Sequence, residues 1–346
     1  MTATLPDLVH SLEHGERVDA HLGTIVHVVG SRQARPNLPS TGCPFCVGGI
    51  EAPDEYHVRW FRNRWPAMPG DRCEVVLYTP HHDATFWSLG VEGVGKVIDL
   101  WTERTAELGA RDDVDFVLVF ENRGPEVGAT IAHPHGQIYA YDHIPDRPGR
   151  IFTAGWQPDS RPGERYVASY GGWQAYVPYA PTYPVSLVLA PTERVANLES
   201  LSTQGRADLA VLLVDIFERL DSLYDAPLPY MMWLMQQPTG GGDWPDAWFH
   251  IEIVSPWRSK GVPRFIAAAE VACNEFFNPV IPEVLAERLR DIAQSTSVTS
   301  STFSSESVSA SLSMTDSGTE SMTAGDRRDE ISRYVAPPTT AATDTH

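Results

Sequence analysis

The stretch FVLVFENRGPEVGATIAHPHGQIYA, residues 116–140, decides the fold, because its pattern occurs twice in the chain. It begins with an apolar run typical of a buried strand, passes through a glycine-containing loop, and ends in a strand with a His-x-His pair. Residues 230–254, YMMWLMQQPTGGGDWPDAWFHIEIV, repeat this order and end in a His-x-Glu pair. The match predicts two copies of one structural unit.

The segments upstream of each block extend the repeat. Each copy has two strand-like runs followed by a run with helical periodicity, and the spacing from Pro80 to His133 matches that from Pro191 to His250 apart from a loop insertion. In the first predicted helix Val94, Val97, Ile98 and Trp101 fall on one face. The predicted strands of the first copy are 55–63, 74–79, 114–122 and 137–142, with a helix over 91–111. In the second copy, residues 173–184 followed by 185–201 parallel 55–68 followed by 74–89, and a helix is predicted over 206–224.

This order predicts an α+β fold in which helices pack on antiparallel strands. We expect an N-terminal unit over 1–160 that holds the chemistry, a C-terminal unit over 161–293, and a disordered tail over 294–346. The tail is dominated by Ser and Thr with almost no large apolar side chains, so it cannot bury enough surface to offset its chain entropy.

Composition excludes several classes of function. The chain has 346 residues and a formal net charge of −19, which argues against nucleic acid or an anionic membrane surface as a partner. No run of about 18 apolar residues occurs, and the first residues do not resemble a signal peptide. We therefore expect a cytoplasmic protein. Cys73 and Cys273 are isolated, and we expect both to be buried thiols.

The chemistry is carried by His133, His135 and Gln137. Alternate residues of a strand project from one face, so the three side chains are expected on the same side. An imidazole is largely unprotonated near neutral pH and is a plausible nucleophile towards a phosphoanhydride. Gln137 could donate a hydrogen bond to a phosphoryl oxygen without acting as an acid, which fits group transfer better than hydrolysis. We predict that His135 carries a nucleoside monophosphate.

Cys43 and Cys46 form a C-x-x-C pair in a loop rich in proline and glycine. Two thiolates at this spacing supply half of a tetrahedral zinc site, with His81 or His82 and His133 as candidates for the rest. The alternative is a thioredoxin-like redox pair, in which the two cysteines stand at the start of a helix in a βαβ unit. We favour zinc.

Phosphate-binding groups are expected at two further places. Backbone N–H groups of the glycine-rich turn from Asn122 to Thr130 can meet phosphate oxygens. Arg32 and Arg35, close together in an acidic chain, could clasp a diphosphate, although a solvated loop is an equally good interpretation.

Over residues 20–293 the chain resembles the galactose-1-phosphate uridylyltransferase family of the histidine-triad superfamily. The resemblance lies in GTIVHVVGSRQARP, CPFC, FRNRWPAM, TPHH, FENRGPEVGATIAHPHGQIYA, VPYAPTYP and ERLRDIA. It implies two tandem histidine-triad-like units and a ping-pong exchange, in which His135 takes uridylate from UDP-glucose and passes it to galactose 1-phosphate.

The resemblance also implies roles for individual residues and a homodimer with sites near the subunit interface. His135 and Gln137 would be catalytic. Zinc would be held by Cys43, Cys46, His82 and His133. Nucleotide-sugar and sugar-phosphate substrates would be bound by Arg32, Arg35, Asn63, Asn122, Gly128 and Thr130.

The chain departs from the family pattern at three places. Asn63 is followed by Arg64, where some members have Asn-Asp for the uridine. His250 and Glu252 stand where some members have a His-x-His metal pair, so we expect that second metal site to be absent or altered. The connection after the HPHGQ strand, residues 143–152, is short and rich in proline, so the region near the sugar is expected to differ.

Three other functions compete with uridylyl transfer. One is adenylyl transfer from an ADP-sugar to phosphate or another sugar phosphate. Another is a nucleotide-binding module without turnover. The third is a zinc-stabilised interaction protein whose tail is the functional part.

Overall fold

The computed structural model describes residues 14–30, 32 and 42–293. The predictions for a tail over 294–346 and for Arg35 therefore lie outside the described residues. Within the described part, no helix combines the length and the apolar character needed to cross a membrane.

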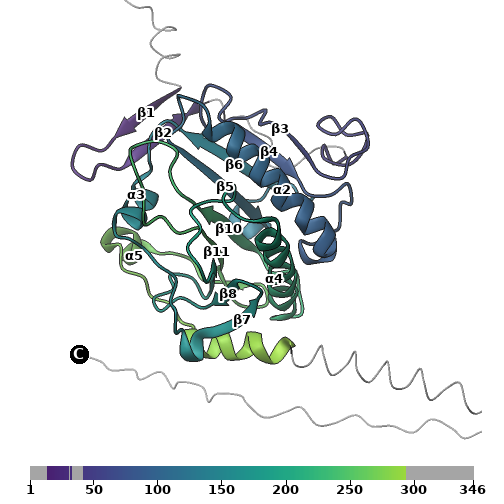
Figure 1. The fold of residues 1–346 in the computed structure, drawn as a ribbon, viewed down its shortest axis with the longest axis vertical. Helices are drawn as coiled ribbons and strands as arrows, with labels where there is room; N and C mark the ends of the chain where they lie inside the picture. Colours follow the sequence, from purple (N-terminus) through teal and green to yellow (C-terminus); the bar gives the residue numbers. More distant parts are fainter. Residues whose placement is uncertain (1–13, 31, 33–41, 294–346) are drawn as a thin grey trace, which may run out of the picture. The chain divides into compact units, whose positions relative to one another are not determined.

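The framework is a nine-stranded sheet in the order β3-β4-β6-β5-β10-β11-β9-β8-β7 (Figure 1). All of its neighbouring strands pair antiparallel. Its strands are β3 Arg59–Arg62, β4 Cys73–Leu77, β5 Phe116–Arg123, β6 His135–Tyr141, β7 Tyr166–Tyr170, β8 Trp173–Tyr176, β9 Val185–Pro191, β10 Tyr230–Met235 and β11 His250–Ser255.

The strand order contains the predicted repeat. The series β3-β4-β6-β5 of the first half corresponds to β8-β9-β11-β10 of the second. The two halves meet where β5 pairs with β10, with Asn122 opposite Met231. The predicted α+β class with antiparallel strands and packed helices is confirmed.

Two long helices lie side by side over one face of this sheet: α2, Gly90–Gly109, and α4, Thr203–Ser222 (Figure 1). The expected apolar face of α2 is confirmed, since Val94, Val97, Ile98 and Trp101 are all buried in the main core. At the start of α4 the side chain of Ser202 accepts a hydrogen bond from Gly205 N at 3.0 Å, which satisfies one of the N–H groups that a helix start leaves unpaired.

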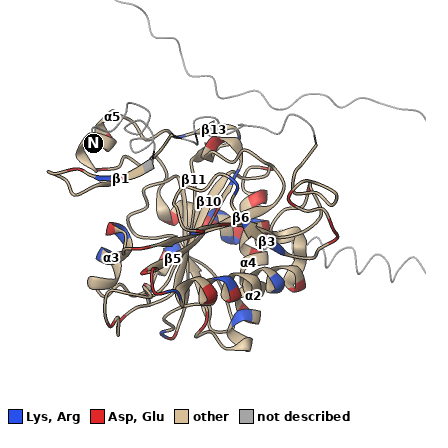
Figure 2. Ribbon diagram, turned by 90° about the horizontal axis from the view of Figure 1, so that it is seen from above, with Lys and Arg blue, Asp and Glu red and all other residues tan. Residues whose placement is uncertain are grey.

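Acidic and basic residues lie along α2 (Figure 2), and one of them, Arg104, is buried. The guanidinium of Arg104 donates to both carboxylate oxygens of Glu74, at 2.7 and 2.9 Å. It also lies 3.5 Å from the ring centroid of Trp60. This buried ion pair ties α2 to β4.

The remaining elements are short. Helix α3, Asp146–Thr153, packs on the sheet face opposite α2, where Phe152 joins Phe116 in a separate apolar cluster. The others are β1 His14–Val18 with β2 Ile25–Val29, β12 Trp257–Ser259 with β13 Val262–Pro263, α5 Ala268–Cys273, a helix over 282–293, and the 3-10 turns η2 Trp87–Leu89, η3 Pro125–Val127 and η4 Gly163–Arg165.

The sequence prediction missed some elements and misplaced one thiol. The hairpin strand β1, the edge strand β7 and helix α3 were not predicted. Cys73 is buried as expected, but the expectation for Cys273 is wrong because this side chain is exposed at the end of α5.

The alternation of β6 prepares the site. Gly136, Ile138 and Ala140 are buried, and the last two join the core beneath α2. His135 and Gln137 project from the other face and are half-buried. A one-residue change of register would bury the histidine and expose the core.

Candidate functional site

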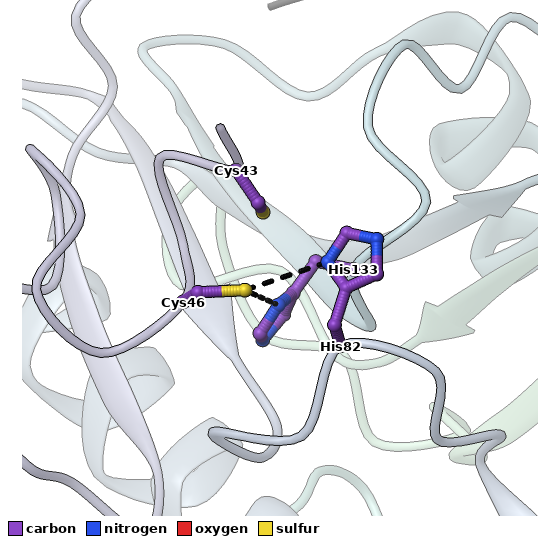
Figure 3. Close-up of side chains that lie close together, drawn as sticks. All are labelled: Cys43, Cys46, His82 and His133. Atoms are coloured by element: carbon purple, nitrogen blue, oxygen red, sulfur yellow. Dashed lines mark hydrogen bonds between the residues drawn. The ribbon is translucent and has the colours of Figure 1, made fainter. Parts of the chain in front are cut away.

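Four potential metal ligands converge from three separate parts of the chain (Figure 3). Cys43 and Cys46 come from the loop before β3, His82 from the loop after β4, and His133 from the segment that enters β6. Their ligand atoms all lie within 4.8 Å of one another. The Sγ of Cys46 lies 3.5 Å from Nδ1 of His82 and 3.6 Å from Nδ1 of His133.

The ring of His133 is held so that Nδ1 faces the cysteines. Its Nε2 lies 2.7 Å from the carbonyl oxygen of Thr79 and 3.0 Å from the hydroxyl of Tyr56. Because a carbonyl only accepts hydrogen bonds, Nε2 carries the proton and the lone pair is on Nδ1. Burial lowers the pKa of His133, which favours the neutral form that a metal ligand requires.

Hydrogen bonds also fix the loop that carries Cys43 and Cys46, called here the cysteine loop. The backbone N–H of Phe45 donates to Sγ of Cys43 at 3.4 Å. Burial is the main cause that raises the pKa of Cys46, and the neighbouring Cys43 is the second, so a nearby cation would favour its thiolate form. The hydroxyl of Tyr56 lies 2.7 Å from the carbonyl oxygen of Phe45 and 2.8 Å from that of Thr79, and thereby joins this loop to the one leading to His82.

These four side chains could hold a metal ion. Zinc bonds of about 2.3 Å to sulfur and about 2.0 Å to nitrogen, at a tetrahedral angle, separate the two atoms by roughly 3.5 Å. Both sulfur–nitrogen distances, 3.5 and 3.6 Å, agree with this value. Of the two alternatives considered for the third ligand, His82 is in the cluster and His81 is not.

A second group of potential ligands, Glu16, Asp142 and His143, has a different character. Arg72 forms an ion pair with Asp142, and Nδ1 of His143 lies 3.0 Å from the same carboxylate. The guanidinium of Arg72 therefore already balances the charge of the Asp142 carboxylate, which a metal ion would otherwise do.

His135, the predicted nucleophile, is the first residue of β6. Its Nδ1 lies 2.7 Å from the backbone carbonyl oxygen of His133, so Nδ1 carries the proton and the lone pair is on Nε2. The ring packs against Phe45, with centroids 5.0 Å apart. His135 is therefore linked to the metal cluster in two ways. Its ring is bonded to the backbone of His133, a ligand of the cluster, and it packs on Phe45 of the cysteine loop.

A cavity of about 210 Å³ adjoins His135. It gathers four of the predicted site residues, His135, Gln137, Asn63 and Thr130. Nδ2 of Asn63 donates to Oε1 of Gln137 at 3.3 Å, and Oδ1 of Asn63 accepts from Trp65 N at 2.9 Å. The Gln137 carbonyl is thus engaged, and its NH₂ group could donate a hydrogen bond to a ligand in this cavity.

The other predicted substrate-binding residues lie elsewhere. Asn122 shares a smaller, neighbouring cavity with His135. Gly128 lines neither cavity, and its N–H donates to Pro125 O at 3.1 Å inside the turn. Its positive φ of 84° makes glycine suitable there. Arg32 lies within electrostatic reach of Cys73 rather than beside His135.

The corresponding corner of the second half contains an ion pair. Nη2 of Arg147 lies 2.8 Å from each carboxylate oxygen of Glu252, and His250 stacks on Trp156 with centroids 3.7 Å apart. Burial alone would raise the pKa of Glu252, but His250 and Arg147 outweigh it and lower that pKa to about 2. An ion pair with Arg147 therefore engages Glu252, the residue that corresponds to His135 in the first half.

Sequence reasoning missed two residues of this region. Tyr56 orients His133, and Glu51 lines the cavity beside His135. Neither belongs to a motif, and only the fold of the loop between Cys46 and β3 brings them to the site.

Comparison with known proteins covers most of the described chain. The family described as galactose-1-phosphate uridyl transferase, N-terminal domain, matches residues 65–145, and the corresponding C-terminal domain matches residues 133–301. Galactose-1-phosphate uridylyltransferase of Thermotoga maritima is 33% identical over 300 residues, which cover 77% of this chain and 94% of the relative. The enzyme of the same name from Streptomyces lividans is 34% identical over 286 residues, covering 74% and 80%.

Solved structures agree in fold. A structure described as uridylyltransferase superposes with a TM-score of 0.74 at 26% identity and covers 81% of this chain and 98% of its own. An ADP-glucose phosphorylase from Arabidopsis thaliana has a TM-score of 0.63 at 20% identity, covering 80% and 98%. At that identity the second likeness concerns the fold alone.

Proposed function

The chain belongs to the galactose-1-phosphate uridylyltransferase family, and we propose that it exchanges a uridylyl group between UDP-glucose and galactose 1-phosphate. The observation that carries the proposal is the 2.7 Å contact between Nδ1 of His135 and the carbonyl oxygen of His133. This contact sets the tautomer in which Nε2 has the lone pair of a nucleophile.

In the first half-reaction Nε2 of His135 attacks the α-phosphorus of UDP-glucose. A nitrogen–phosphorus bond forms, and the bond from that phosphorus to the bridging oxygen breaks. Glucose 1-phosphate leaves with the electron pair. The imidazole becomes positively charged because it keeps its Nδ1 proton, and the carbonyl of His133 stabilises that charge through the 2.7 Å hydrogen bond.

In the second half-reaction a phosphate oxygen of galactose 1-phosphate attacks the same phosphorus, and the nitrogen–phosphorus bond breaks. UDP-galactose is formed and the imidazole returns to its neutral state. Gln137 donates its amide N–H to a phosphoryl oxygen in both steps, held by Asn63 at 3.3 Å. Transfer to a second phosphate requires no general acid at this position, which agrees with a glutamine there.

The test is covalent labelling. UDP-glucose with a labelled uridine should transfer its label to the protein and release one glucose 1-phosphate per label. His135→Asn should abolish labelling, whereas His143→Asn, which lies outside the cavity, should not. A His135→Asn protein with full turnover would disprove the mechanism.

The choice of nucleotide is tested with the donor. We expect UDP-glucose to label the protein faster than ADP-glucose at equal concentration. Faster labelling by ADP-glucose would support the adenylyl-transfer alternative instead. Tight binding of either donor without glucose 1-phosphate release would support a binding module.

We also infer that the metal is zinc, held by Cys43, Cys46, His82 and His133. Two thiolates and two imidazoles at tetrahedral spacing are a set that zinc favours. A structural zinc would supply fixed geometry, because it ties the cysteine loop to the segment that enters β6. The residues of the chain perform the transfer itself.

We further propose a homodimer in the cytoplasm. Exposed apolar side chains near α5, among them Phe265 at 77% and Phe277 at 68% exposure, support contact with a second copy. Cys43 and Cys46 acting as zinc ligands, and not as a disulfide, would suit a reducing compartment. Light scattering on the purified protein would measure the assembly, and a monomer at micromolar concentration would count against it.

A further inference from the structure

The cavity beside His135 has two charged side chains in its wall, Glu51 and Arg64. If a nucleotide is transferred to Nε2 of His135, as proposed above, the nucleoside attached to that phosphorus must occupy the adjoining space. The cavity of about 210 Å³ has both His135 and Gln137 in its lining. Glu51 and Arg64 are therefore positioned to contact the nucleoside.

Glu51 is held firmly in this wall. Its N–H donates to Pro44 O at 3.0 Å, and its carbonyl accepts from Nε of Arg59 at 2.9 Å. In its carboxylate, Oε1 lies 2.8 Å from Nε of Arg64. The side chain of Glu51 is only 18% exposed, whereas that of Arg64 is 50% exposed. The carboxylate is thus preorganised by its own backbone and by one guanidinium.

One acceptor of this carboxylate is still available. Among the described residues, no hydrogen bond or ion pair engages Oε2 of Glu51. An ionised carboxylate only accepts hydrogen bonds, so a ligand that satisfies it must bring O–H or N–H donors. A hydrogen bond to a partly buried carboxylate is stronger than one between neutral groups, so a ligand that supplies the donor gains affinity.

Of the parts of a nucleotide, ribose fits this requirement best. Phosphate oxygens are acceptors and would be repelled by Glu51. A uracil ring has one N–H donor, but it stands between two carbonyl oxygens that a carboxylate would repel. The ribose 2′- and 3′-hydroxyls are adjacent donors that a single carboxylate can bind together. The apolar walls from Phe45, Phe61 and Val75 are left for the flat base.

We infer that Glu51 is a ribose-binding residue, whose carboxylate accepts hydrogen bonds from the sugar hydroxyls of the nucleotide donor. The inference rests on the proposed function, because it requires the nucleoside to lie beside His135. It also gives Arg64 a role. Through its ion pair, Arg64 orients the carboxylate of Glu51, which comes from another loop.

The experiment combines a change in the protein with a change in the donor. We would measure kcat/KM for UDP-glucose and for its 2′-deoxy and 3′-deoxy analogues, with wild type and with Glu51→Ala. Wild type should favour the ribose donor by about tenfold to a hundredfold. Glu51→Ala should lose a similar factor with UDP-glucose, mainly through KM, and should barely distinguish the three donors.

Two further variants keep the test decisive. Glu55→Ala, an exposed glutamate of the same loop, should retain the wild-type preference. Glu51→Gln preserves the shape of the side chain and should fall between wild type and Glu51→Ala, so a folding defect in the alanine variant would not obscure the result. Thermal unfolding of each variant checks the fold.

The outcomes separate the two claims. Absence of labelling with every donor in the wild type would overturn the proposed function. Normal transfer with an unchanged ribose preference in both Glu51 variants would overturn only the role of Glu51. A third outcome would assign Glu51 to the base. If methylation of uracil N3 in the donor lowers kcat/KM in wild type but not in Glu51→Ala, while both proteins use the deoxy donors as well as UDP-glucose, the inference is wrong.

Discussion

The hydroxyl of Tyr78 lies directly against the backbone of Gly136, in the space that a Cβ on this glycine would occupy. Gly136 separates His135 from Gln137, so this contact lies immediately beneath the predicted catalytic pair. The absence of a side chain at Gly136 is therefore a packing requirement of the site.

Gly136→Ala should damage both the site and the fold. The new methyl group would overlap the buried Tyr78 hydroxyl and come within 3.1 Å of the Phe120 carbonyl oxygen, which is backbone and cannot move aside. Overpacking of this kind costs about 1–3 kcal/mol. We expect a lower melting temperature and a loss of uridylyl transfer. Tyr78→Phe in the same protein should partly restore both.

A matched control is Gly95→Ala in the interior of α2. A Cβ at Gly95 meets nothing within 4 Å, so helix propensity alone acts and should stabilise the protein by roughly 0.5–1 kcal/mol. Equal destabilisation by the two alanines would contradict the steric argument.

Glu121 should make stability depend on pH. Its carboxyl is buried, with the hydroxyl of Tyr230 donating to Oε1 at 2.7 Å, and burial raises its pKa from 4.5 to about 7. Because the pKa of Glu121 in the folded protein lies above its value in the unfolded chain, the folded state favours the protonated carboxyl. The contribution of Glu121 to the free energy of unfolding is therefore fully present below pH 4.5 and is lost as the pH rises towards 7.

Glu121→Gln should remove this loss. Urea unfolding at a series of pH values should show the variant gaining on wild type by on the order of 3 kcal/mol across that window, with no further change above it. A difference that stays constant with pH would mean that Glu121 does not titrate there.

Cys46→Ser should remove the metal. Wild type is expected to contain about one zinc per chain, and the variant close to none, by elemental analysis. The loop that holds Phe45 against His135 should then loosen, with lower thermal stability and slower labelling. Cys273→Ser, at an exposed thiol outside the cluster, should keep both the zinc and the activity. A fully active wild type without zinc would refute the assignment.

Arg104→Met should leave Glu74 as an unpaired charge in the core. The side chains of Arg104 and Glu74 are only 2% and 3% exposed, and breaking such a pair costs about 3–5 kcal/mol. Arg104→Met with Glu74→Leu should recover most of the free energy of unfolding, because both charges are then gone. If the double variant is as unstable as the sum of the single ones, the pair is not coupled.

Local patterns predicted the framework well. The apolar face of α2 and the strands β4, β5, β6 and β10 follow from runs whose period matches burial on one side or both. Helix α3 was missed because it buries only Pro148 and Phe152, too few apolar residues to produce a periodic signal. The boundary near residue 160 between the two units stays a prediction.

The site was predictable where a motif concentrates polar residues. The cluster of Cys43, Cys46, His82 and His133 was expected from the family resemblance and is brought together in the structure. The contact of Glu51 with Arg64 could not be predicted, because no sequence period relates two loop residues whose approach depends on the path of the chain. Tyr56, which contacts His133 across the same loop, is a similar case.

The pairing of β5 with β10 has a consequence for how this chain can be divided. A cut of the chain between β6 and β7 would separate the halves. It would leave β5 and β10 as edge strands with unpaired backbone groups, and each strand is rich in apolar side chains. Such edges seek another strand. Either fragment produced alone should therefore aggregate, whereas the two produced together have a ready partner in one another and should reassemble as a split enzyme.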